Sequence, residues 1–109
     1  MERKTHLPLW FKERVAKVEE LGHKAGAKQA WELIERHFGH CKADTAMRNE
    51  RESLLVTLEL PFATAERRIA WDRIEAFRER FRLGLNVDFP ERDGATQCLL
   101  FFFPEANTG

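Results

Sequence analysis

The 109-residue sequence lacks net charge and long apolar stretches, and each absence excludes a class of protein. Eighteen basic residues balance eighteen acidic residues, so no overall electric field attracts a polyanion. No run of about eighteen apolar residues occurs, and the N-terminal residues lack the apolar core of a signal peptide. We therefore expect a soluble, cytoplasmic protein with no membrane partner.

Residues that carry common catalytic chemistry are also scarce. Cys41 and Cys98 form no local CxxC pair, and in an intracellular protein we expect both as free thiols. Ser53 is the only serine and lacks the glycine elbow of a serine hydrolase. The glycines of residues 22–28 do not have phosphate-loop spacing. We therefore expect no cofactor and assign no catalytic residue.

The residues that are abundant indicate a folded protein. Hydrophobic residues make up 43% of the chain, with nine Phe and three Trp, and this length suffices for one core. We expect residues 1–109 to form a single domain.

Two apolar stripes at helical spacing occur within residues 9–38. Gly22 and Gly26 lie between the stripes and favour a break or bend, although one long helix remains an alternative. The second stripe ends at Gly39, where a left-handed glycine commonly terminates a helix. The sequence thus predicts one or two amphipathic helices.

The remainder alternates between strand and helix patterns. Residues 40–51 show no periodicity and are expected to form a polar connection. Alternating apolar residues predict strands at 54–60 and 83–89, and Thr64 is a plausible N-cap for a helix over 64–82. Turn residues at 90–94 precede a final strand that runs to Pro104 and has no polar side chain from Cys98 to Phe103.

These elements predict an α+β fold. We expect a two-layer sandwich in which helices 64–82 and 9–38 pack on a three-stranded mixed sheet built from a β-α-β-β hairpin unit. In a variant, residues 5–10 add an N-terminal strand and give the order βαβαββ.

The final apolar run needs cover on both sides of the sheet, because neighbouring residues of a strand point to opposite faces. A loop at 90–94 places Phe89 opposite Ala95 and Leu85 opposite Leu99. One face then holds Leu83, Leu85, Val87 and Phe89 with Leu99, Phe101 and Phe103. A slip of one residue would exchange the two faces.

The opposite face is mixed in character and is the predicted binding surface, provided that all helices cover the first face. If the N-terminal helices cover it instead, the domain is a closed three-layer monomer. We predict a small non-enzymatic protein-binding domain, with an adaptor, regulatory or inhibitory role, that self-associates or binds a protein partner. The predicted contact residues are Leu55, Thr57, Asn86, Cys98, Leu100 and Phe102.

An arginine-rich helix supports an alternative function, which is nucleic-acid binding. Guanidinium groups suit phosphates, and the N-terminal half has a slight excess of basic residues. Interleaved acids, including Glu75 three residues before Arg78, favour an ordinary solvated helix face. The arginines are Arg67, Arg68, Arg73, Arg78, Arg80 and Arg82.

Two further clusters support a third interpretation, an enzyme of unknown reaction. His37, His40 and Cys41 could present soft ligands on one helical face, but Gly39 interrupts that helix, so we predict no metal site. Glu59, Asn86 and Asp88 could share one sheet face if their strands are neighbours.

Overall fold

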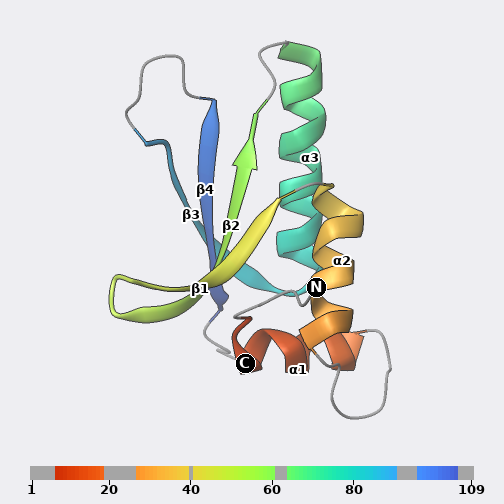
Figure 1. Cartoon of the computed structure of the whole chain (residues 1–109), viewed down its shortest axis with the longest axis vertical. Coiled ribbons are helices and arrows are strands. Elements are labelled where there is room, and N and C mark those ends of the chain that lie inside the picture. Colours follow the sequence, from red (N-terminus) through yellow and green to blue (C-terminus); the bar gives the residue numbers. More distant parts are fainter. Residues whose placement is uncertain (1–6, 19–26, 40, 61–63, 91–95, 106–109) are drawn as a thin grey trace, which may run out of the picture.

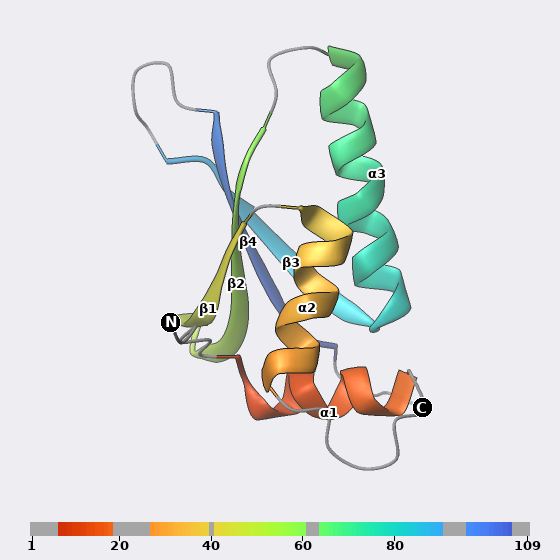
Figure 2. The same cartoon turned by 45° about the vertical axis from the view of Figure 1, so that its right-hand side comes forward.

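The computed structural model describes residues 7–18, 27–39, 41–60, 64–90 and 96–105. Three helices and four strands follow the order α1 (Leu9–Val18), α2 (Ala27–Phe38), β1 (Lys42–Arg48), β2 (Arg51–Glu59), α3 (Thr64–Arg80), β3 (Leu83–Asp88) and β4 (Gln97–Pro104). The three helices lie on the same side of the sheet (Figures 1 and 2), so the α+β prediction is confirmed.

The four strands are arranged in the order β1-β2-β4-β3, and every neighbouring pair is antiparallel. The expected three-stranded mixed sheet was therefore wrong. β2 and β3 run in the same direction, but β4 lies between them, because the chain returns from β3 into the gap beside β2. The final apolar run is thus an inner strand of the sheet, paired with β2 on one side and with β3 on the other.

The additional strand, β1, comes from the segment that we expected to be a polar connection. β1 and β2 form a hairpin closed by Arg48 and Arg51, with Asn49 and Glu50 between them. Both turn residues have positive φ, 51° and 63°, which is the type I′ geometry that matches the twist of a two-residue hairpin. The usual glycine is absent from this turn, which removes its strongest sequence signal.

At the N-terminus, the strand proposed for residues 5–10 is not found. Leu9 and Trp10 belong to α1, and Thr5 and His6 lie outside the described residues. The amides of Phe11 and Lys12 donate to the carbonyl of Pro8 (both 3.1 Å), so this proline sits at the start of the helix. Within residues 9–38 the structure has two helices, and the segment 19–26 between them lies outside the described residues.

The helix ends follow local sequence signals closely. Gly39 terminates α2 with a φ of 79°, and its amide donates to the carbonyl of Glu35 at 2.7 Å. α3 ends at Arg80 rather than Arg82, and Arg82 has a positive φ of 52°. The guanidinium of Arg14 on α1 donates to the carbonyls of Phe81 (2.5 Å) and Arg82 (2.7 Å), so α1 caps the turn between α3 and β3.

Aromatic rings form the core between the helices and the sheet. Phe77 of α3 lies at its centre, with ring centroids 5.7 Å from Phe11, 4.9 Å from Phe38, 5.0 Å from Phe81 and 5.1 Å from Phe102. This cluster joins all three helices to β4. Apolar burial of this size dominates the stability of a small domain.

Replacing Glu50 by glycine should stabilise the protein, because a β-carbon is disfavoured at positive φ. We expect Glu50→Gly to raise the free energy of unfolding by about 0.5–1 kcal/mol in urea titrations. Glu52→Gly, two residues further along in β2, is the matched control and should lower it. Equal destabilisation by both variants would contradict the turn geometry.

Arg14→Met should destabilise the protein, since it removes the charged donor from two carbonyls and keeps most of the aliphatic stem. The expected loss is about 1–3 kcal/mol in the free energy of unfolding. Lys17→Met on the exposed side of the same helix serves as the control, with an expected change below about 0.5 kcal/mol. A similar effect from both substitutions would show that Arg14 does not act as a cap.

Candidate functional site

The sheet face opposite the helices is the first candidate site, and we call it the open face. Its members follow from the registers, in which Asp44 lies opposite Leu55, Leu55 opposite Phe101, and Phe101 opposite Asn86. Every second residue from these points to the same side. Besides Gly84, the open face carries Lys42, Asp44, Ala46, Arg48, Arg51, Ser53, Leu55, Thr57, Glu59, Asn86, Asp88, Gln97, Leu99, Phe101 and Phe103.

The open face is curled rather than flat. Arg48 at the end of β1 pairs with Asp88 of β3, with Nη1 and Oδ2 3.2 Å apart, although β1 and β3 are the two outer strands. In a flat sheet, three strand spacings separate these edges by about 14 Å. The β1–β2 hairpin therefore bends over the open face, on the side away from the helices in Figure 1.

Two arginines from the hairpin stack on aromatic rings of β4. The guanidinium of Arg48 lies 4.7 Å from the ring centroid of Phe101, and that of Arg51 lies 5.1 Å from the centroid of Phe103. Phe101 is only 7% exposed as a result. The ring of Phe103 also lies where a β-carbon on residue 84 would be, which explains why Gly84 occurs inside a strand.

Only half of the predicted contact residues lie on the open face. Leu55, Thr57 and Asn86 do, and each is partly exposed. Cys98, Leu100 and Phe102 instead point to the helix layer and are fully buried. The predicted register was wrong: Leu85 lies opposite Phe102 rather than Leu99, an odd shift that exchanges the two faces.

The residues that sequence reasoning missed are therefore Leu99, Phe101 and Phe103, together with both hairpin arginines. Every residue from Cys98 to Phe103 is apolar, so the composition of this strand does not indicate whether its odd-numbered or its even-numbered side chains face the core. The β1–β2 hairpin would have given the missing information, because recognising a strand at 42–48 places Arg48 in the sheet itself.

The arginines of α3 do not form one basic surface. At about 100° per residue, Arg67 and Arg78 fall on one flank of the buried stripe, and Arg73 and Arg80 fall on the other. Arg82 lies beyond the helix, and Arg78 is held by Glu75 through Nε (3.0 Å) and Nη2 (2.8 Å). The predicted pairing of Glu75 with Arg78 is confirmed.

Acidic residues occupy the outermost side of the same helix. Asp72, Glu75 and Glu79 follow one another at spacings of three and four and are exposed. Exposed Arg68 lies among them, four residues before Asp72, so a polyanion that approached this side of α3 would meet three carboxylates and one guanidinium. The geometry thus favours a solvated helix face over a phosphate-binding one.

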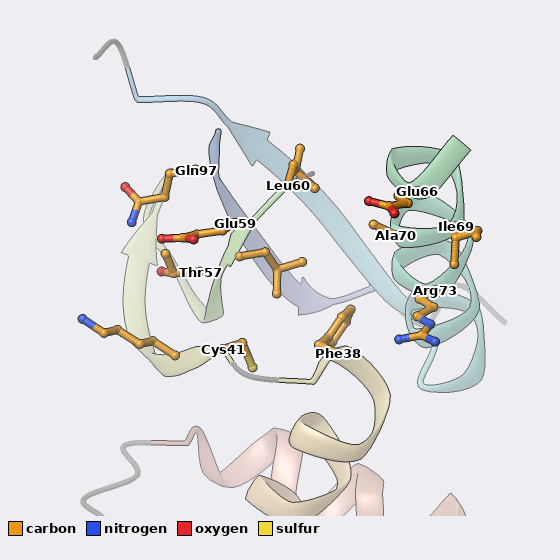
Figure 3. Close-up of a pocket in the computed structure, with 12 residues that line it drawn as sticks. Phe38, Cys41, Thr57, Glu59, Leu60, Glu66, Ile69, Ala70, Arg73 and Gln97 are labelled. Carbon is orange, nitrogen blue, oxygen red and sulfur yellow. The ribbon is translucent and has the colours of Figure 1, made fainter. Parts of the chain in front are cut away.

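A cleft of about 620 Å³ lies between α3 and the end of β2. Its apolar lining comes from Phe38, Leu58, Leu60, Ile69 and Ala70, and its polar lining includes Glu59, Glu66, Arg73 and Gln97. In Figure 3, Glu66 and Ala70 face the strands across the cleft, whereas the carboxylate of Glu59 points away from α3. The two carboxylates therefore do not converge as an acid–base pair.

Cys41 also lines this cleft, and its surroundings suppress its reactivity. Burial, followed by the nearby charge of Glu35, raises the pKa of the Cys41 thiol to about 11. Burial, followed by Asp88, raises the pKa of Cys98 to about 11 as well. A nucleophilic cysteine needs the opposite shift, so the cleft beside Cys41 is poorly suited to thiolate chemistry.

Other catalytic groups are dispersed within the described part of the chain. His37 donates from Nε2 to the carbonyl of Arg73 at 2.6 Å, so it links α2 to α3. His40 lies outside the described residues, and among those described no three His, Cys, Asp or Glu residues form a group that could hold a metal ion. Glu59 and Asp88 share the open face, but β4 separates their strands and Arg48 engages Asp88.

Comparisons of the chain with protein-family models, with curated proteins and with solved structures find no match. Among the described helices, none is long and apolar enough to cross a membrane.

The raised thiol pKa values predict slow alkylation of the folded protein. At pH 7 a thiol with a pKa of about 11 is ionised in roughly one molecule in ten thousand, so iodoacetamide should react far more slowly than with the unfolded chain. Mass spectrometry after timed quenching, with urea-unfolded protein as the control, measures the ratio. Equal rates in the two states would contradict the burial of both thiols.

The same shifts predict how stability changes with alkaline pH. Below the ordinary thiol pKa of 9.0, both states keep their thiol protons and stability is unaffected. Above it the unfolded chain loses protons first, so the free energy of unfolding should fall as pH rises through about 11. Cys98→Ala should reduce this dependence in urea titrations; an unchanged slope would contradict the assignment.

Proposed function

We propose that this protein is a non-enzymatic binding domain, of adaptor, regulatory or inhibitory type, that holds a protein partner on its open face. The observation that carries the proposal is that all three helices pack on one side of the sheet (Figure 2), so that among the described residues only the β1–β2 hairpin extends over the other side. A sheet face that carries apolar side chains is normally covered by another layer or by a partner.

The chemistry of the open face supports a protein partner. Leu55, Leu99 and Phe103 are only partly buried, and they lie beside the arginines that stack on β4. Aromatic residues and arginine are the types most enriched at protein interfaces and at their hot spots. Single apolar residues on a surface need no explanation, but a contiguous group of this kind marks a contact site.

The other two interpretations receive less support. Nucleic-acid binding would use arginines that fall on two flanks of α3, with acids on its outer side. An enzyme would use the cleft beside Cys41 and Glu59, which offers a concave volume but no converged pair of reactive groups. Both therefore rank below protein binding.

Site-specific photo-crosslinking tests the proposal. With benzoyl-phenylalanine in place of Thr57, near the middle of the open face, we expect a discrete adduct in extracts of the source organism. The same probe in place of Glu79, on the outer side of α3, is the control and should give none. Identical adducts from both positions, or none from either, would count against an open-face partner.

The captured protein must then bind in purified form. Leu99→Asp should weaken its affinity by about tenfold or more, because it places a charge in the apolar centre of the contact. Glu79→Ala should leave the affinity unchanged, and both titrations use isothermal calorimetry. Equal affinities for Leu99→Asp and the unaltered protein would refute binding through this face.

A further inference from the structure

The sheet ends in two edge strands, β1 and β3, whose outward-pointing backbone groups can be assigned. The amide of Leu60 donates to the carbonyl of Thr96 at 2.7 Å, and these two residues are opposite each other in the β2–β4 pair. The backbone amides and carbonyls of even-numbered residues in β2 and β4 therefore point toward each other across this pair. The backbone amides and carbonyls of odd-numbered residues in β4 then point toward those of even-numbered residues in β3. The amides and carbonyls of Leu83, Leu85 and Val87 consequently point away from the sheet.

The β1 edge is protected against strand addition. It carries Lys42, Asp44 and Arg48, and its hairpin bends away over the open face. The outward amide of Thr45 donates to the carboxylate of Asp44 at 2.7 Å, so that backbone donor is already used. Charges, bends and local capping are the usual devices that keep an edge strand from pairing.

The β3 edge has none of these devices within the described residues. Its sequence contains no proline or lysine, and its one charged residue, Asp88, is paired with Arg48. Leu85 and Val87 are partly exposed, and beyond them Phe89 is 54% exposed with its ring 6.4 Å from that of Trp71 on α3. Leu83 is fully buried, so the accessible edge runs from Leu85 to Phe89.

This accessible segment is complementary to itself. In an antiparallel pairing centred on Asn86, Leu85 faces Val87 of the second copy, and Gly84 faces Asp88. Apolar residues then meet apolar residues and no like charges are opposed. The outward groups of Leu85 and Val87 supply about four hydrogen bonds across the two-fold axis.

We propose that a second copy of this chain adds to the sheet through antiparallel pairing of the two β3 edges. The inference rests on the proposed function in one respect, because it takes the protein to be a binding domain that also self-associates. The edge pairing places the self-association at β3 and leaves the open face for the protein partner. The product is one continuous sheet with both helix layers on the same side.

Sedimentation equilibrium over the micromolar range tests the pairing. The protein should dimerise, and Val87→Pro should weaken the dimer about tenfold or more, because it removes an outward amide and spares the β3–β4 ladder. Ala43→Pro removes an outward amide from the β1 edge and is the matched control, with an unchanged dimer. Far-ultraviolet circular dichroism confirms that both variants fold.

Asn86→Cys gives a readout that does not depend on a destabilising change. In the proposed register the two residues at 86 form a non-hydrogen-bonded pair with α-carbons about 4.5 Å apart, which permits a disulfide. Mild oxidation should yield a covalent dimer, while buried Cys41 and Cys98 do not compete. Asp72→Cys, on the outer side of α3, should yield none.

Several results would overturn the inference. These are a monomer at the highest attainable concentration, a dimer insensitive to Val87→Pro, or an Asn86→Cys protein that forms no disulfide. Leu99→Asp separates the two proposals, because it should abolish open-face binding and leave the dimer intact. If Leu99→Asp dissociates the dimer, self-association uses the open face, and the edge pairing is wrong while the proposed function stands.

Discussion

The insertion of β4 between β2 and β3 is the constraint on which the rest of the structure depends. Even-numbered residues of β4 enter the aromatic core, where Phe102 meets Phe77 and joins the sheet to the helices. The odd-numbered side chains lie on the open face, where the guanidinium groups of the hairpin arginines stack on the rings of Phe101 and Phe103. An apolar run with no alternation suits a strand that has neighbours on both edges and contacts on both faces.

The curl of the sheet makes its two edge strands different in character. Because the β1–β2 hairpin bends across the open face, β1 becomes a twisted, charged edge whose outward amide at Thr45 is capped. β3 stays short and nearly uncharged beside Trp71 and Phe89. The open face and the β3 edge are thus distinct surfaces of one sheet, so a contact on one leaves the other accessible.

Sequence reasoning succeeded where the signal was local. The end of α2 at Gly39, the alternation of Leu54, Val56 and Leu58, and the pairing of Glu75 with Arg78 each depend on residues within one turn or one strand. It failed where the structure depends on how distant segments pair. The register of β4 is set by whether its odd-numbered or its even-numbered side chains are buried, and a strand that is apolar at every position does not indicate which.

The missed hairpin had the larger functional consequence. Without β1 there is no reason to place Arg48 near Phe101, and the open face is then judged from β2, β3 and β4 alone. An ion pair with both partners a third to a half exposed, such as Arg48 with Asp88, contributes little to stability. On the proposed function, it holds a long side chain in position before a partner arrives, and such immobilisation otherwise costs about 0.5–1.5 kcal/mol per side chain on binding. On that proposal, the ion pair that holds the curl contributes more to recognition at the open face than to the stability of the fold.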